Sequence, residues 1–161
     1  MKFHRCGWLV RAVCATLCVG SFEAQATPLN KDYDYYLTGA AADAVRPQPA
    51  TAATALMGGH TDVDAAFLWM IGKAGGGDFV VLRATGADDY NAYVYAMGGG
   101  VDSVETLVIK TREGALSAFV VDKINQAEMI FIAGGDQGDY VNLWKDTPVD
   151  AAIRNAMADL E

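Results

Sequence analysis

Residues 75–86 read GGGDFVVLRATG and contain the strand on which the fold prediction rests. Phe79–Leu82 is apolar at every position, which is typical of a parallel strand covered on both faces. Val104–Ile109 is also predicted to be a strand, and so is Met129–Ala133, which closes on Gly134-Gly135. Because parallel strands need long crossover connections, we expect helices between these runs.

The segments around these strands have the spacing of amphipathic helices. Apolar residues recur at i, i+4, i+7, i+8 and i+11 in two places: Val63, Phe67, Met70, Ile71, Ala74 and then Val149, Ile153, Ala156, Met157, Leu160. A further helix is predicted around Leu116–Ile124, a short strand over Thr54–Met57 and a loop over Thr85–Gly100. This alternation predicts an α/β domain built on a parallel sheet, with any ligand bound past the carboxyl ends of the strands.

The N-terminus predicts export. The first residues are basic at Lys2, His4 and Arg5. Gly7–Phe22 is an apolar run broken only by Arg11, and Ala24-Gln25-Ala26 is a small-x-small cleavage site. A membrane-spanning helix needs about 20 uninterrupted apolar residues, which Arg11 prevents. We therefore interpret residues 1–26 as a secretory signal peptide. The mature protein is expected to be periplasmic or extracellular and not held at a membrane.

The composition of the mature chain excludes several classes of protein. Cys6, Cys14 and Cys18 all lie in the signal segment, so no disulfide scaffold, cysteine nucleophile or thiolate metal site is expected. About 135 residues remain, which favours one domain. The net charge of -8 becomes -10 once the +2 of the signal segment is removed. Such a surface repels nucleic acid and attracts cationic ligands, although solubility is the commoner reason for an acidic surface.

Residues 27–53 differ in composition from the rest of the mature chain. They contain a tyrosine cluster, Tyr33, Tyr35 and Tyr36, and then a stretch rich in alanine, proline and threonine. Prolines in that stretch favour an extended connector over a helix. We therefore divide the chain into a signal peptide, a leader and connector over 27–53, and an α/β domain over 54–161.

The most informative motif is Gly134-Gly135-Asp136-Gln137, directly after a buried strand. The glycines permit a positive φ and a close approach of backbone to a ligand, and their N–H groups can face an oxyanion. The Gln137 amide can hydrogen-bond a substrate amide or carboxylate. A tight strand-to-helix turn with Asp136 as the cap explains the same residues equally well.

The other polar residues give weaker signals. Gly58-Gly59-His60-Thr61-Asp62 lacks the lysine of a phosphate loop and the glycine spacing of a dinucleotide site, and Thr61 or Asp62 as a helix cap explains it. His60 is a single histidine, which is too few for a usual zinc site. Neither Ser103 nor Ser117 lies in a nucleophile elbow. No metal or cofactor is predicted.

Four blocks of the sequence carry a resemblance to a family. They are LMGGHTDVDAAFLWM (Leu56–Met70), GGGDFVVLRATG (75–86), VDSVETLVI (Val101–Ile109) and IFIAGGDQGDYVNLWKDTPV (Ile130–Val149). Together they resemble exported members of the cyanophycinase-like serine peptidases, and the tyrosine-rich leader resembles that of the same exported group.

The resemblance implies a parallel three-layer α/β fold that is flavodoxin-like, as in class I glutamine amidotransferases. It implies hydrolysis of β-aspartyl-type, cyanophycin-like peptides, with Gly134, Gly135, Asp136 and Gln137 next to the substrate. His60 departs from the usual glycine run of the family. The family's serine elbow and its glutamate and histidine partners follow the helix that we predict over Pro148–Leu160. No residue of this chain matches them, so the implied domain is incomplete and inactive by itself.

A second hypothesis comes from a different class of protein. The chain is then a non-catalytic exported module whose acidic, glycine-lined surface binds cationic or amide ligands. Both hypotheses direct attention to the same strand ends, and they differ in whether a nucleophile acts there.

Overall fold

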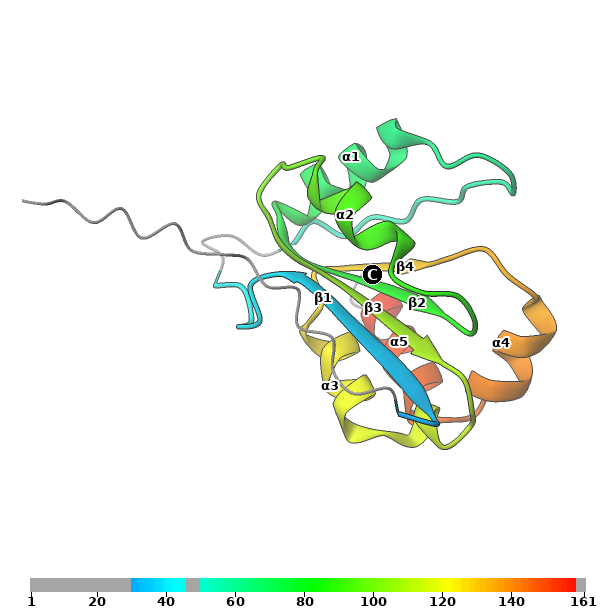
Figure 1. Ribbon diagram of the computed structural model, residues 1–161. Helices are drawn as coiled ribbons and strands as arrows, with labels where there is room; N and C mark the ends of the chain where they lie inside the picture. The colour runs from blue at the N-terminus through cyan, green and yellow to red at the C-terminus, as the bar shows by residue number, and fades with distance from the viewer. Residues whose placement is uncertain (1–29, 46–49, 159–161) are drawn as a thin grey trace, which may run out of the picture.

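The computed structural model describes residues 30–45 and 50–158. These described residues form four strands and five α-helices arranged around one sheet (Figure 1). In chain order the elements are β1 (Tyr33–Gly39), α1 (Asp64–Ala74), β2 (Gly77–Arg83), α2 (Asp89–Tyr95), β3 (Val101–Ile109), a 3₁₀ turn (Gly114–Leu116), α3 (Ala118–Gln126), β4 (Met129–Ile132), α4 (Gln137–Trp144) and α5 (Pro148–Ala158). The predicted α/β class is confirmed.

The sheet is mixed, with the strand order β1-β3-β2-β4. The strands β3, β2 and β4 run parallel, whereas β1 pairs antiparallel with β3, from Tyr33 opposite Ile109 to Gly39 opposite Ser103. The prediction of an all-parallel sheet is therefore wrong at one edge. Residues assigned to a leader ahead of the domain form this edge strand, so the expected boundary at residue 54 does not separate them from the sheet.

The alternation of side chains in β1 explains its place at the edge. Tyr35 is buried, and Tyr33 and Leu37 pack against the same apolar cluster. Asp34, on the opposite face of the strand, forms a 2.8 Å salt bridge with Lys110. One apolar and one polar face is the pattern of an antiparallel edge strand. Three closely spaced tyrosines did not display this pattern clearly in the sequence.

Helices pack against both faces of the sheet (Figure 1). On one face α1 and α2 contribute Phe67, Ile71 and Val94 to a cluster with Phe79 and Val81 of β2. The other face is covered by α3, α4 and α5. Their buried residues are Val120, Ile124, Trp144, Val149 and Ala152. The central strand β2 is consequently at most 1 % exposed from Phe79 to Leu82, as its continuous apolar run predicts.

Three local predictions differ from the structure. Thr54–Met57 belongs to no strand, and the segment 85–100 contains the helix α2. The residue at the N-cap of α1 is Val63, without a side-chain cap, rather than Thr61 or Asp62. Helix α2 has only seven residues, too short for a periodic signal, and its one deeply buried apolar side chain is Val94.

Other local predictions are confirmed. Gly75 ends α1 in the left-handed conformation, with φ of 73°, which glycine adopts without strain. Pro148 is the first residue of α5. The predicted signal peptide and Leu160 lie outside the described residues. Within the described part of the chain, no helix has the length and apolar character needed to cross a membrane.

Candidate functional site

The Gly134–Gln137 motif forms the turn between β4 and α4. Asp136 is the N-cap of α4, and its Oδ1 accepts a 2.7 Å hydrogen bond from the Gly138 N–H. All four residues of the motif are exposed. The capping interpretation of Asp136 is therefore confirmed, and the motif remains accessible at the carboxyl end of β4.

The two glycines of this motif differ in their surroundings. Neither has a positive φ, so the conformational freedom that glycine permits is not used at this position. A Cβ on Gly135 would lie 2.6 Å from the Tyr140 hydroxyl, whereas nothing lies within 4 Å of a Cβ on Gly134. The Tyr140 hydroxyl donates a 2.8 Å hydrogen bond to the Ala133 carbonyl. Gly135 thus makes room for a tyrosine that holds the end of β4 against α4.

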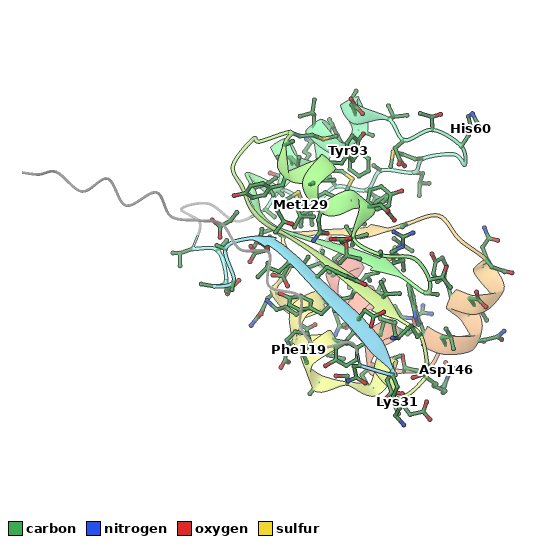
Figure 2. All side chains as sticks on the ribbon, in the orientation of Figure 1. Lys31, His60, Tyr93, Phe119, Met129 and Asp146 are labelled. Atoms are coloured by element: carbon green, nitrogen blue, oxygen red, sulfur yellow. The ribbon has the colours of Figure 1, made fainter. Side chains whose placement is uncertain are left out.

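A concave pocket of about 540 Å³ lies beside the loop before α1 and the start of α2. We call it the aspartate–tyrosine pocket. Its lining residues are Thr61, Asp62, Asp64, Arg83, Asp89, Tyr90 and Tyr93. Figure 2 shows Tyr93 on the same side of the sheet as His60, above the strands. The pocket combines residues far apart in the chain, as ligand sites in open α/β sheets do.

Two tyrosine hydroxyls are hydrogen-bonded to carboxylates of this pocket. Tyr90 donates to Asp62 Oδ2 at 3.1 Å, and Tyr93 donates to Asp64 Oδ1. The hydrogen bond to Asp64 raises the pKa of Tyr93 to about 12. Burial, and then the hydrogen bond to Asp62, raises the pKa of Tyr90. Both phenols are neutral at pH 7 and act as hydrogen-bond donors to the two carboxylates.

Arg83 at the end of β2 forms the floor of the pocket. Its guanidinium donates to the carbonyls of Thr85 and Ala87, and it forms a 2.9 Å salt bridge with Asp89. The Arg83 Cζ also lies 5.9 Å from the centre of the Tyr90 ring. The guanidinium therefore orders the loop after β2 and is engaged with a carboxylate and a ring of the pocket.

The pocket and the Gly134–Gln137 turn are neighbours. The ring centres of Tyr90, in the pocket, and Phe131, in β4, are 5.1 Å apart. Burial raises the pKa of Tyr140 next to the turn, and the positive charge of Arg83 opposes this rise. The sequence pattern predicted only a loop around Tyr90 and Tyr93 and did not mark Arg83 as a site residue. A charged residue that ends an apolar strand was the available signal.

The other candidates from the sequence, His60, Ser103 and Ser117, do not line the aspartate–tyrosine pocket. His60 is exposed on the loop before α1 with φ of 108°. No cluster of three or more possible metal ligands occurs within residues 30–45 and 50–158. Ser117 immediately precedes α3, on the opposite face of the sheet.

Ser103 belongs to a buried polar network that sequence analysis missed. Its hydroxyl is hydrogen-bonded to Asp78 at 2.8 Å and lies 3.2 Å from Glu105 Oε1. Glu105 also accepts a 2.8 Å bond from Tyr35 and forms a 2.9 Å salt bridge with Lys123. Ser103 is 0 % exposed and has carboxylates, not a histidine, as partners. These contacts give it a structural role.

Comparison of the chain with family models and with curated proteins finds no match.

Proposed function

We propose that this chain is the substrate-binding part of an exported cyanophycinase-like serine peptidase with a flavodoxin-like, class I glutamine amidotransferase-like fold. Its substrates are β-aspartyl-type, cyanophycin-like peptides. The observation that carries the proposal is the aspartate–tyrosine pocket next to the Gly134–Gln137 turn. The resemblance of the four sequence blocks supplies the family, and the pocket supplies a place for a cationic side chain.

The charges of the pocket favour a guanidinium. Asp89 is already paired with Arg83, whereas Asp62 and Asp64 accept hydrogen bonds from neutral tyrosines. A planar cation can bind both carboxylates through charge-assisted hydrogen bonds and lie against the rings of Tyr90 and Tyr93. The net charge of -8 adds a long-range attraction for cations.

The turn after β4 suits the rest of such a substrate. Gln137 is the first residue of α4 and is exposed at the carboxyl end of a parallel strand. A helix N-terminus favours negative charge, and the glutamine amide can hydrogen-bond an aspartyl carboxylate or amide. The arginine and aspartyl portions of the substrate would then lie over the pocket and the turn, respectively.

Hydrolysis needs a nucleophile that the described residues do not supply. Ser103 is buried among carboxylates, and Ser117 lies at the start of α3, on the opposite face. Loss of the nucleophile and its base lowers the rate of a serine hydrolase by about 10⁶-fold. We therefore expect this chain alone to bind the substrate class without cleaving it.

A non-catalytic module that binds cationic or amide ligands is the second candidate function. The absence of a serine–histidine pair from the described residues favours it. The two functions predict the same ligand site, and they differ only in whether a nucleophile belongs there.

Calorimetry with β-aspartyl-arginine and β-aspartyl-alanine dipeptides tests the site. We expect only the arginine dipeptide to bind, and Asp62→Asn and Asp64→Asn each to weaken it about tenfold, the value of a charge-assisted hydrogen bond of about 1.5 kcal/mol. Asp122→Asn, at an exposed position of α3, is the matched control. Equal binding of both dipeptides would refute the site. Labelling of Ser103 or Ser117 by a fluorophosphonate would refute the assignment of this chain as non-catalytic.

A further inference from the structure

One cation, Arg83, lies among the carboxylates of the aspartate–tyrosine pocket, and part of its hydrogen-bonding capacity is unused. Its Nε donates to the Thr85 carbonyl at 2.7 Å. Its Nη1 donates to the Ala87 carbonyl and to Asp89 Oδ2, each at 2.9 Å. Among the described residues, no acceptor lies within hydrogen-bond distance of Nη2. Because each terminal nitrogen of a guanidinium carries two N–H groups, this pair of donors remains for a ligand.

The loop after β2 is shaped around this guanidinium. Gly86 has φ of 103°, and a Cβ on it would lie 2.2 Å from the Arg83 Nη2. Glycine alone provides this space and adopts this backbone conformation without strain. The carbonyls on either side of Gly86 hold Nε and Nη1. The guanidinium is therefore fixed before a ligand arrives, which reduces the entropy lost on binding.

Asp89 is the partner of Arg83 that a ligand can replace. The side chain of Asp89 is 75 % exposed, whereas that of Arg83 is 16 % exposed. An ion pair with such an exposed partner contributes little to stability, because water competes for the carboxylate. When Asp89 turns away, Arg83 keeps its two backbone acceptors and stays in place. A ligand carboxylate can then occupy the position that the Asp89 carboxylate leaves.

Tyr90 connects the basic end of the pocket to its acidic end. Its ring centre lies 5.9 Å from the Arg83 Cζ, and its hydroxyl donates to Asp62 Oδ2 at 3.1 Å. One tyrosine side chain thus spans the distance between the two ends, which is the scale of an amino acid with a long cationic side chain. Arg83 repels a cation and attracts an anion, so the charges orient such a ligand. Its cation faces Asp62 and Asp64, and its carboxylate faces Arg83.

We propose that Arg83 binds the free α-carboxylate of an arginine unit whose guanidinium binds Asp62 and Asp64, and that this carboxylate displaces Asp89. The proposal rests on the proposed function, because it uses the same pocket and the same cationic side chain. It makes Arg83 a specificity-determining residue. The substrate class narrows to arginine units with a free α-carboxylate, and arginine whose carboxyl group is an amide binds more weakly.

Two small ligands isolate the carboxylate. Nα-acetyl-arginine and Nα-acetyl-argininamide share the guanidinium and differ in whether the carboxyl group is charged. Each is titrated into the isotope-labelled full-length chain, and the shifts of its amide resonances give the dissociation constant. We expect the acid to bind about tenfold more tightly than the amide, the value of one charge-assisted hydrogen bond. Binding of the amide measures the guanidinium site alone, and the ratio of the two constants measures the contribution of Arg83.

Three variants assign this ratio to its residues. Asp89→Asn removes the competing carboxylate and should raise the preference for the acid by about threefold. Asp88→Asn removes the same charge at the neighbouring exposed position, which does not line the pocket, and should change the ratio by less than about 1.5-fold. Arg83→Gln should bring the ratio to about one. Circular dichroism verifies folding, and if Arg83→Gln does not fold, the two aspartate variants still decide.

The outcomes separate this proposal from the proposed function. If the amide binds and the acid binds no more tightly, the role of Arg83 is refuted and the guanidinium site stands. The role of Arg83 is also refuted if Arg83→Gln keeps the preference for the acid, or if Asp89→Asn and Asp88→Asn give the same ratio. If neither ligand binds at millimolar concentration, the guanidinium site itself is refuted, and the role of Arg83 with it.

Discussion

Replacement of Lys123 by methionine should strongly destabilise the fold, because Lys123 is the cation paired with buried Glu105. Glu105 is 2 % exposed, and both of its oxygens lie within 3.0 Å of the Lys123 Nζ. Removal of one partner from a buried ion pair costs about 3–5 kcal/mol. Lys123 is itself 16 % exposed, so water already screens the pair in part. We therefore expect the lower end, a loss of about 3 kcal/mol.

Urea unfolding followed by circular dichroism measures this loss. With a slope of about 1.5 kcal/mol per molar, the midpoint should fall by about 2 M. The double variant Lys123→Met with Glu105→Gln removes both charges and keeps an acceptor for the Tyr35 hydroxyl, so its loss should be only about 1 kcal/mol. Lys145→Met, at an exposed position on the same face of the sheet, is the control and should change stability by less than about 0.5 kcal/mol.

Two results would refute this role of the Lys123–Glu105 ion pair. If Lys123→Met lowers the urea midpoint no more than Lys145→Met does, Lys123 does not compensate the buried charge of Glu105. The same conclusion follows if the double variant loses as much free energy of unfolding as Lys123→Met and Glu105→Gln lose together when each is measured alone, because the losses of coupled partners are not additive.

Three further predictions concern the site and its supports. Gly135→Ala should destabilise the protein by about 1–2 kcal/mol because the new Cβ displaces the Tyr140 hydroxyl, whereas Gly134→Ala should be nearly neutral. The melting temperatures of the two variants, compared with that of the unmodified protein, test this difference. Ultraviolet titration should find one phenol with a pKa near 12 that returns towards 10 in Asp64→Asn. Because folding raises the pKa of Tyr93, its contribution to stability is fully present below pH 10 and is lost as the pH rises from 10 through about 12. The Asp146 N–H, and then Arg154, lowers the pKa of Asp150, so the destabilisation caused by Asp150→Asn should be present at neutral pH and vanish below about pH 3.8.

Long periodic segments were predictable from the sequence, and short or irregular ones were not. Phe67, Ile71 and Ala74 are buried as their spacing predicts, and the apolar run of Phe79–Leu82 is the central strand. Helix α2 was missed because seven residues make only two turns. Thr54–Met57 has the apolar character of a strand but pairs with no strand of the sheet.

The candidate site was predictable only in part. Gly134–Gln137 stood out because a glycine pair after an apolar strand marks a strand end in this fold class. The partnership of Asp62 with Tyr90 and of Asp64 with Tyr93 was not visible, because each pair is separated by nearly thirty residues that fold back through α1 and β2. Single-residue preferences carry no information on such contacts.

The stretch 75–86 shows where sequence and tertiary structure divide. By itself it determined a buried strand, the glycine that ends α1 and the class of the domain, because backbone preference and apolar periodicity act over a few residues. Only the tertiary structure decided that β1 pairs antiparallel with β3 and that Arg83 meets Asp89 and Tyr90. It also decided that β4 pairs with β2 at one end of the strand order among the described residues. These features depend on which distant segments come together, and that choice is made by the burial and charge of the whole chain.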